Sequence, residues 1–301
     1  LYMYCFLSGM SNILIYGCRK TGSTLTQRLL ELDDYTFFPV ETKIKSFKKF
    51  INLKNNSEIN LEILRGHFPI KYNEKFKINE KIYNRYLLEN YYKFLNFKDF
   101  ITLHVEALEK AKNSFNKNFI IKEIAGDTKL LIDNFLSSFP NSKVVFIKRN
   151  PKFISKAVFT DRHRKKIKLT LKKKMLEVIE PHIILSFIGH YKNNKNVYIL
   201  NYENLISNVE DEIKKLCQFL NIKFLSKYTI PTLNGERTIV DTSSKKKFGL
   251  FKANKSLMYD ITLLEFFLIL LSRPLALIYL LLYKAKLLNF FIKNKEFIKT
   301  L

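Results

Sequence analysis

The residues Asn12–Leu32 constrain the fold of this chain more than any other segment of its sequence. A short apolar run, NILIYG, leads into the loop CRKTGST, and an amphipathic run with helical spacing follows at once. In such a strand–loop–helix unit, backbone N–H groups of the loop and the first helical turn lack helical partners, so they can bind an anion. Lys20 adds a cation, and the loop adds three hydroxyl groups, from Thr21, Ser23 and Thr24. The segment therefore predicts a phosphate-binding loop.

This loop differs from the common loop of ATP- and GTP-binding proteins. In the pattern G-x-x-x-x-G-K-[ST] the lysine follows the second glycine. Here Lys20 precedes Gly22, and no lysine follows that glycine in the loop. The alternative interpretation of KTGST is an ordinary helix-capping turn with three hydroxyl groups.

Apolar runs of strand length alternate with helical patterns along most of the chain. The strand-like runs are 12–16, 36–40, 119–124, 143–147 and 196–200, and the clearest helical patterns are 127–139 and 208–220. This alternation predicts an α/β fold in three layers, with a mainly parallel sheet flanked by helices and a P-loop-like nucleotide-binding core. Ligands of such sheets bind at the carboxyl ends of the strands, where Lys20 and Arg149 would both lie. We expect one α/β domain over 1–260 and a separate apolar and basic helical segment over 261–301.

Two later segments repeat the pattern of a strand that leads into a functional turn. In KVVFIKRNPKFISKAVF (143–159), Arg149 ends the strand, and its planar guanidinium suits a phosphate. In NVYILNYENLISNVEDEIKKLCQFL (196–220), Ser207 and Glu210 predict a capping box for the helix. Tyr202 and Glu203 in this segment are interpreted as structural rather than catalytic residues.

Taken in order, these segments resemble the sulfotransferase family, which uses 3′-phosphoadenosine 5′-phosphosulfate (PAPS) as sulfuryl donor. The family loop typically has the sequence P-K-S-G-T-T, and the corresponding residues of this chain, Arg19–Thr24, are R-K-T-G-S-T. Family members grip the nucleotide 3′-phosphate with an arginine like Arg149 and a serine eight residues later. This chain has Ala157 at that position, so Ser155 is the candidate. The stretch NGERTIVDTSSKKKFG (234–249) resembles the family segment that closes over the nucleotide.

The resemblance implies a role for each matching residue. Lys20 is the expected catalytic cation, opposite the charge that develops on the departing phosphate. The base that takes the acceptor proton is His67 in RGHFP, which resembles the family's H-x-P segment, or Glu41 in FFPVETK. Lys122 and Glu123 are candidates for lining the acceptor site. No metal is expected. The residues expected to bind PAPS are Arg19, Lys20, Thr21, Gly22, Ser23, Thr24, Arg149, Ser155, Ser243 and Ser244.

The charge of the chain is strongly positive, with 52 Lys and Arg residues against 27 Asp and Glu, or +25 net. The densest basic run is Arg162–Lys174. It is either a solvated helix face or a contact for an anionic partner, such as a membrane or an acidic acceptor like a sulfated glycan. Nucleic acid is not an expected partner, because no zinc-finger or RNA-binding signature is present. The three cysteines show no C-x-x-C spacing, which indicates a reducing compartment and no zinc site.

The apolar run 261–283 is long enough to cross a bilayer, but Glu265 and Arg273-Pro274 interrupt it. An arginine at the centre of a span costs about 2.5–3.5 kcal/mol on insertion scales. We therefore expect two short helices broken at Pro274, either packed on the domain or lying in a membrane interface. The expected location is the cytoplasm, with peripheral contact to the inner face of a membrane as an option.

The sequence thus predicts a sulfotransferase that moves a sulfuryl group from PAPS to an acceptor hydroxyl, on a carbohydrate or a lipid, by in-line displacement. Two alternatives stay open. One is an ATP-dependent small-molecule kinase, and the other is a basic nucleic-acid- or membrane-binding protein on a degenerate nucleotide-binding fold.

Overall fold

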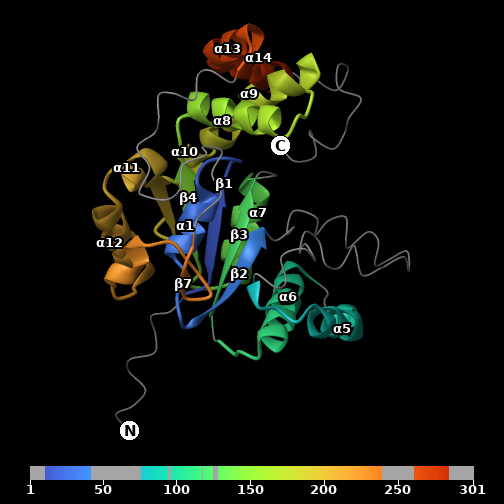
Figure 1. Cartoon of the computed structure of the whole chain (residues 1–301), viewed down its shortest axis with the longest axis vertical. Coiled ribbons are helices and arrows are strands. Elements are labelled where there is room, and N and C mark those ends of the chain that lie inside the picture. Colours follow the sequence, from blue (N-terminus) through green and yellow to red (C-terminus); the bar gives the residue numbers. More distant parts are fainter. Residues whose placement is uncertain are drawn as a thin grey trace.

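Five parallel strands form the central sheet, in the order β2-β3-β1-β4-β5 (Figure 1). The computed structural model describes residues 11–41, 76–93, 96–116, 118–124, 128–238 and 261–284. The predicted α/β class with a mainly parallel sheet between helices is confirmed. The strands are β1 (Ile13–Gly17), β2 (Tyr35–Glu41), β3 (Asn118–Ile124), β4 (Lys143–Lys148) and β5 (Val197–Asn201).

The two faces of the sheet are buried in two separate cores, because successive side chains of a strand point to opposite faces. Along β1, Leu14 and Tyr16 enter the first core, and Ile13 and Ile15 enter the second. The first core is covered mainly by α5 (Glu80–Asn90), α6 (Phe97–Lys112) and α7 (Thr128–Ser138). The second is covered by α1 (Ser23–Leu29), α11 (Tyr202–Ser207) and α12 (Val209–Leu220). This double burial is why the central strand is apolar throughout.

The remaining elements connect or extend these layers. They are η3 (Tyr91–Lys93), α8 (Pro151–Arg164), α9 (Leu171–Ser186), α10 (Ile188–Tyr191), η4 (Ser226–Thr229), the hairpin of β6 (Thr232–Leu233) and β7 (Glu236–Arg237), α13 (Leu263–Leu270) and α14 (Ser272–Lys284).

Asparagine caps start two helices directly after strands, and this fixes where the strand ends lie. Asn150 accepts a hydrogen bond from the Lys152 N–H and starts α8 after β4, and Asn201 caps α11 after β5. The capping box predicted at Ser207 is wrong. Ser207 is the last residue of α11, and its hydroxyl donates to the Asn204 carbonyl, so Asn208 becomes the N-cap of α12. The chain is already helical at Ser207, which removes it from the capping position.

The C-terminal helices α13 and α14 pack on α8 and α9, above the carboxyl ends of the strands (Figure 1). The break between them lies at Leu271 rather than at Pro274 as predicted. Pro274 sits in the first turn of α14, where a missing N–H costs no helical hydrogen bond. In the described part of the chain no single helix is long and apolar enough to cross a bilayer, and Leu263–Leu270 with Ser272–Leu282 meets that test only as a pair bent by 63°.

Glu265 anchors α13 to both α8 and α9. Its buried carboxylate lies 2.7 Å from Nε2 of His163 and 2.7 Å from Nζ of Lys174, and it forms a capping box with Thr262. Burial alone would raise the pKa of Glu265, but the hydrogen bonds from Lys174 and His163 outweigh it and lower the pKa from 4.5 to about 2.

We expect Glu265→Gln to destabilise the protein by about 1–3 kcal/mol at neutral pH, because Lys174 loses its anionic partner. The folded pKa lies below the unfolded one, so the carboxylate stabilises the fold fully above its ordinary pKa of 4.5 and progressively less as pH falls towards 2. Urea unfolding should therefore show that the difference in unfolding free energy between wild type and variant becomes smaller as the pH falls from 4.5 towards 2. Glu210→Gln breaks an exposed pair with Lys214 and is the matched control, with a much smaller expected effect because solvent screens the pair. A difference in unfolding free energy that stays constant with pH would contradict the lowered pKa of Glu265.

Candidate functional site

The loop between β1 and α1 is a tight turn closed by its own polar groups. Both the backbone N–H and the hydroxyl of Thr21 donate to the Cys18 carbonyl, at 3.3 and 2.7 Å. Lys20 and Gly22 adopt positive φ angles of 62° and 99°. Gly22 is the N-cap of α1. Because glycine has no side chain, it makes no capping hydrogen bond to the first N–H groups of this helix. The predicted phosphate loop thus has the backbone geometry of an anion site.

Gly22 is required at this position by the ring of Tyr202, the first residue of α11. A Cβ atom added at Gly22 would lie 2.3 Å from both Cδ2 and Cε2 of that ring. Glycine therefore serves two needs here, a left-handed backbone and close approach of an aromatic ring.

We expect Gly22→Ala to destabilise the fold by about 1–3 kcal/mol, because the Tyr202 ring or the loop must move. The matched control is Gly189→Ala, since nothing lies within 4 Å of a Cβ at that position. Alanine there should be neutral or slightly stabilising, because Gly189 lies in a helix. Thermal unfolding of the two variants measures the difference, and equal melting temperatures would show that the loop adapts without cost.

Arg149 follows β4 and reaches across to the loop. Its Nη1 donates to the Lys20 carbonyl at 2.5 Å, and its guanidinium carbon lies 4.5 Å from the centre of the Tyr202 ring. Its Nε is buried and has no hydrogen-bond partner among the residues that the structure describes. Burial lowers the pKa of Arg149, and the neighbouring Tyr202 and Glu203 oppose this effect. The Glu203 carboxylate also accepts from the N–H of Asn150, the residue after Arg149.

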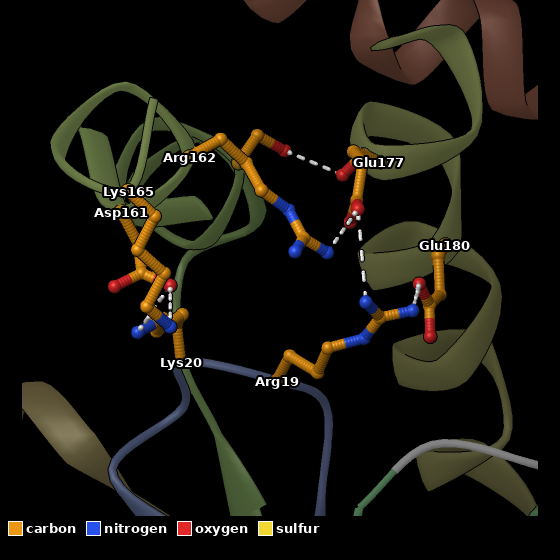
Figure 2. A network of polar contacts seen from close by, with 8 residues as sticks. Arg19, Lys20, Asp161, Arg162, Lys165, Glu177 and Glu180 are labelled. Carbon is orange, nitrogen blue, oxygen red and sulfur yellow. Dashed lines mark hydrogen bonds and ion pairs between the residues drawn. The ribbon is translucent and has the colours of Figure 1, made fainter. Parts of the chain in front are cut away.

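The two cations of the loop are paired with carboxylates from α8 and α9 (Figure 2). Lys20 Nζ lies 3.3 Å from Oδ2 of Asp161. Arg19 lies 3.6 Å from Glu177 and 3.4 Å from Glu180, both on α9. This set of acids is absent from the sequence prediction. It connects the loop to the helices that carry α13 and α14.

Burial and pairing act in opposite directions on the pKa values of Lys20 and Asp161. Burial lowers the pKa of Lys20 from 10.5, and Asp161 opposes that effect. Burial would raise the pKa of Asp161, but the hydrogen bond from Lys165 and the charge of Lys20 outweigh it, so the net shift is downwards. Asp161 is therefore a poor proton acceptor, and its part is to hold and orient the Lys20 amine.

Lys122 brings a second amine to the loop. It is buried in β3, and its Nζ donates to Oγ1 of Thr24 at 3.1 Å. Glu41, the last residue of β2, pairs in register with Lys122. The end of β2 therefore lies at the same edge of the sheet as the loop, although only the backbone of Glu41 is described.

The predicted residue Ser155 makes its hydrogen bond to the backbone of α9 rather than to the loop. It is fully buried in α8 and donates to the Glu177 carbonyl at 3.3 Å, while Ala157 is also buried. The hydroxyl thus serves the contact between α8 and α9 in this structure. The candidates His67, Ser243 and Ser244 lie outside the described residues.

The family model and the solved structures that are similar to this chain are those of sulfotransferases. A sequence model of the sulfotransferase domain family matches residues 10–260. The sulfotransferase domain of the curacin biosynthetic pathway is 17% identical, with 74% of this chain and 78% of that chain covered and a TM-score of 0.51. The corresponding domain of the Synechococcus PCC 7002 olefin synthase is 14% identical, with 88% and 94% covered and a TM-score of 0.53. Mouse sulfotransferase SULT7A1, crystallised with 3′-phosphoadenosine 5′-phosphate (PAP), is 16% identical, with 73% and 62% covered and a TM-score of 0.39.

A search of curated protein sequences gives no significant match. The family model nevertheless spans most of the chain, and the fold is that of the two sulfotransferase domains with TM-scores above 0.5. On this basis the chain belongs to the sulfotransferase domain family.

Proposed function

We propose that this protein transfers a sulfuryl group from PAPS to an acceptor hydroxyl. The observation that carries the proposal is the hydrogen bond from Arg149 to the Lys20 carbonyl, which joins two cations at the carboxyl ends of neighbouring strands. In the family, the loop holds the 5′-phosphosulfate and the strand-end arginine holds the 3′-phosphate. A single donor with phosphates at both positions fits this pair of sites.

The residues present fit the two phosphate ends of PAPS. The buried Nε of Arg149 has no acceptor among the described residues, so an N–H remains for a phosphate oxygen. At the other end, the start of α1 has no side-chain cap, and Ser23 and Thr24 add hydroxyl groups. When bound, PAPS supplies an activated sulfuryl group with PAP as the leaving group.

Lys20 and Lys122 provide positive charge where negative charge grows during transfer. Lys20 is the proposed partner of the departing phosphate oxygen, and Asp161 orients its amine before the donor arrives. Lys122 holds Thr24 and adds a second, buried cation at the same loop. Preorganised charges of this kind stabilise a transition state more than mobile water does.

His67 and Glu41 remain the two candidates for the base that accepts the hydroxyl proton. A histidine base predicts a rate that rises with pH near about 6.5, and a carboxylate base predicts a rise near about pH 4.3. The pH profiles of His67→Gln and Glu41→Gln separate the two. The acceptor hydroxyl is proposed to belong to a carbohydrate or a lipid, and the charge of +25 favours an acidic one.

Calorimetric titration of the purified protein with PAP, and separately with ATP and Mg²⁺, tests the proposal. We expect PAP to bind at least about tenfold more tightly than ATP, a difference of about 1.4 kcal/mol or more. Absence of PAP binding would overturn the proposal. In that case binding of ATP with Mg²⁺ would favour a kinase, and salt-sensitive nucleic-acid or vesicle binding without any nucleotide binding would favour a basic binding protein.

A further inference from the structure

The outward faces of α13 and α14 are apolar to an unusual degree. Nine large hydrophobic side chains in the described part of the chain are more than half exposed. Five of them lie on these two helices, and a sixth, Leu271, lies in the break between them. We call these six the apolar face: Leu263, Phe267, Leu271, Leu277, Ile278 and Leu281. The spacing of three and four residues places each helix's members on one side of that helix. Concentrated exposure of this kind marks an interaction surface rather than the scattered apolar exposure of ordinary proteins.

The opposite sides of the same helices hold them firmly on the domain. Leu268, Ile269, Ala276 and Tyr279 are buried in a core with residues of α8 and α9 such as Phe159. Glu265 adds its contacts with His163 and Lys174. The apolar face therefore belongs to helices that are packed against α8 and α9.

Exposed lysines lie on the connection between α8 and α9, which is near α13. Glu265, in the first turn of α13, contacts His163 near the end of α8 and Lys174 in the first turn of α9. The connection between these two helices thus lies next to α13. It exposes Ile167 together with a group of lysines, and α9 begins with the exposed Leu171. The exposed lysines here are Lys165, Lys166, Lys168, Lys172 and Lys173.

We propose that the apolar face docks on an anionic phospholipid bilayer, with the neighbouring lysines contacting the headgroups. Apolar side chains beside lysines are the composition of interfacial membrane-binding surfaces. A second copy of the chain is a poorer occupant, because a symmetric pairing through this face would bring the two lysine groups towards each other, on chains that each carry +25. The bend of 63° and the buried sides of both helices keep the contact at the surface of the bilayer.

Vesicle flotation of the full chain tests this proposal without any assay of activity. The probes are vesicles of phosphatidylcholine alone and of phosphatidylcholine mixed with phosphatidylserine. The key variant is Leu263→Ser/Leu277→Ser/Leu281→Ser, and its control is Phe115→Ser/Leu225→Ser, which changes exposed apolar side chains elsewhere. The charge variant is Lys166→Glu/Lys168→Glu, and its control is Lys192→Glu/Lys195→Glu, which precedes β5 at the opposite end of the sheet.

We expect the wild type to float with phosphatidylserine vesicles and not with neutral ones. The leucine variant should bind at least about tenfold more weakly with an unchanged melting temperature, because it alters exposed side chains. The lysine variant should also bind less, and both controls should bind as wild type does. No binding by the wild type would overturn the proposal. Binding that salt removes but the leucine variant retains would mean adsorption of a basic protein only, and also overturns it. A wild-type dimer that the leucine variant makes monomeric, without vesicle binding, would assign the face to a second copy instead.

Discussion

Replacing Arg149 with alanine is expected to weaken PAP binding by at least about 100-fold. The side chain offers a buried Nε without an acceptor among the described residues, and its Nη1 holds the Lys20 carbonyl. Alanine removes the proposed charged donor for the 3′-phosphate and also releases the loop that would hold the 5′-phosphate. Hydrogen bonds to charged groups contribute about 1.5–3 kcal/mol each, so the loss of one or two accounts for this factor. Calorimetry with PAP measures it directly.

Three controls separate recognition from misfolding. Arg149→Lys keeps the charge but not the planar fork, and we expect it to recover only part of the affinity. Lys148→Ala removes an exposed cation next in sequence and should leave PAP binding unchanged. Thermal unfolding of each variant reports whether the fold survives. Wild-type affinity in Arg149→Ala would place the 3′-phosphate elsewhere.

The sheet and the loop could be predicted because their signals are local. A short apolar run such as Ile13–Gly17 favours a strand buried on both faces, and the structure places it at the centre of the sheet. The meeting of Lys20 and Arg149 followed from the rule that parallel strands end at one edge. Gly22 was predicted as a loop residue, but its contact with Tyr202 was not, because that contact joins residues far apart in the chain.

The acidic partners of the loop could not be predicted, because their importance depends on tertiary contacts. Asp161 precedes a basic run and looks like a solvated counter-charge, whereas the structure places it beside Lys20. Glu177 and Glu180 are three residues apart in a helix, a spacing that is common on exposed faces. Their proximity to Arg19 arises only when α9 packs over the loop. Ser155 is the reverse case, since a hydroxyl that looked available to a ligand is buried against α9.

Lys20→Met is expected to lower the rate of PAP release from PAPS by about 100- to 1,000-fold, while PAP affinity changes by less than about tenfold. Removing one preorganised donor from a developing oxyanion commonly costs this much in rate. The unbranched methionine replaces the lysine without a change in chain branching at a residue with a φ of 62°. The measurement is PAP release by hydrolysis, in which water accepts the sulfuryl group and sulfate forms, because this reaction requires no identified acceptor. An unchanged rate would remove Lys20 from the chemistry and leave Lys122 as the candidate cation.

Asp161→Asn is the matched variant, because it retains the Lys20 amine and removes the anion beside it. Asp161 raises the pKa of Lys20 against the effect of burial, so its loss lowers that pKa further. In the proposed mechanism the protonated amine is the active form, and activity should therefore disappear at a lower pH in Asp161→Asn than in wild type. At neutral pH the rate should fall far less than in Lys20→Met. If the alkaline limb of the pH–rate profile is the same in Asp161→Asn and in wild type, Asp161 does not affect the pKa of Lys20. Its role would then be to stabilise the end of α8 through its ion pairs with Arg164 and Lys165.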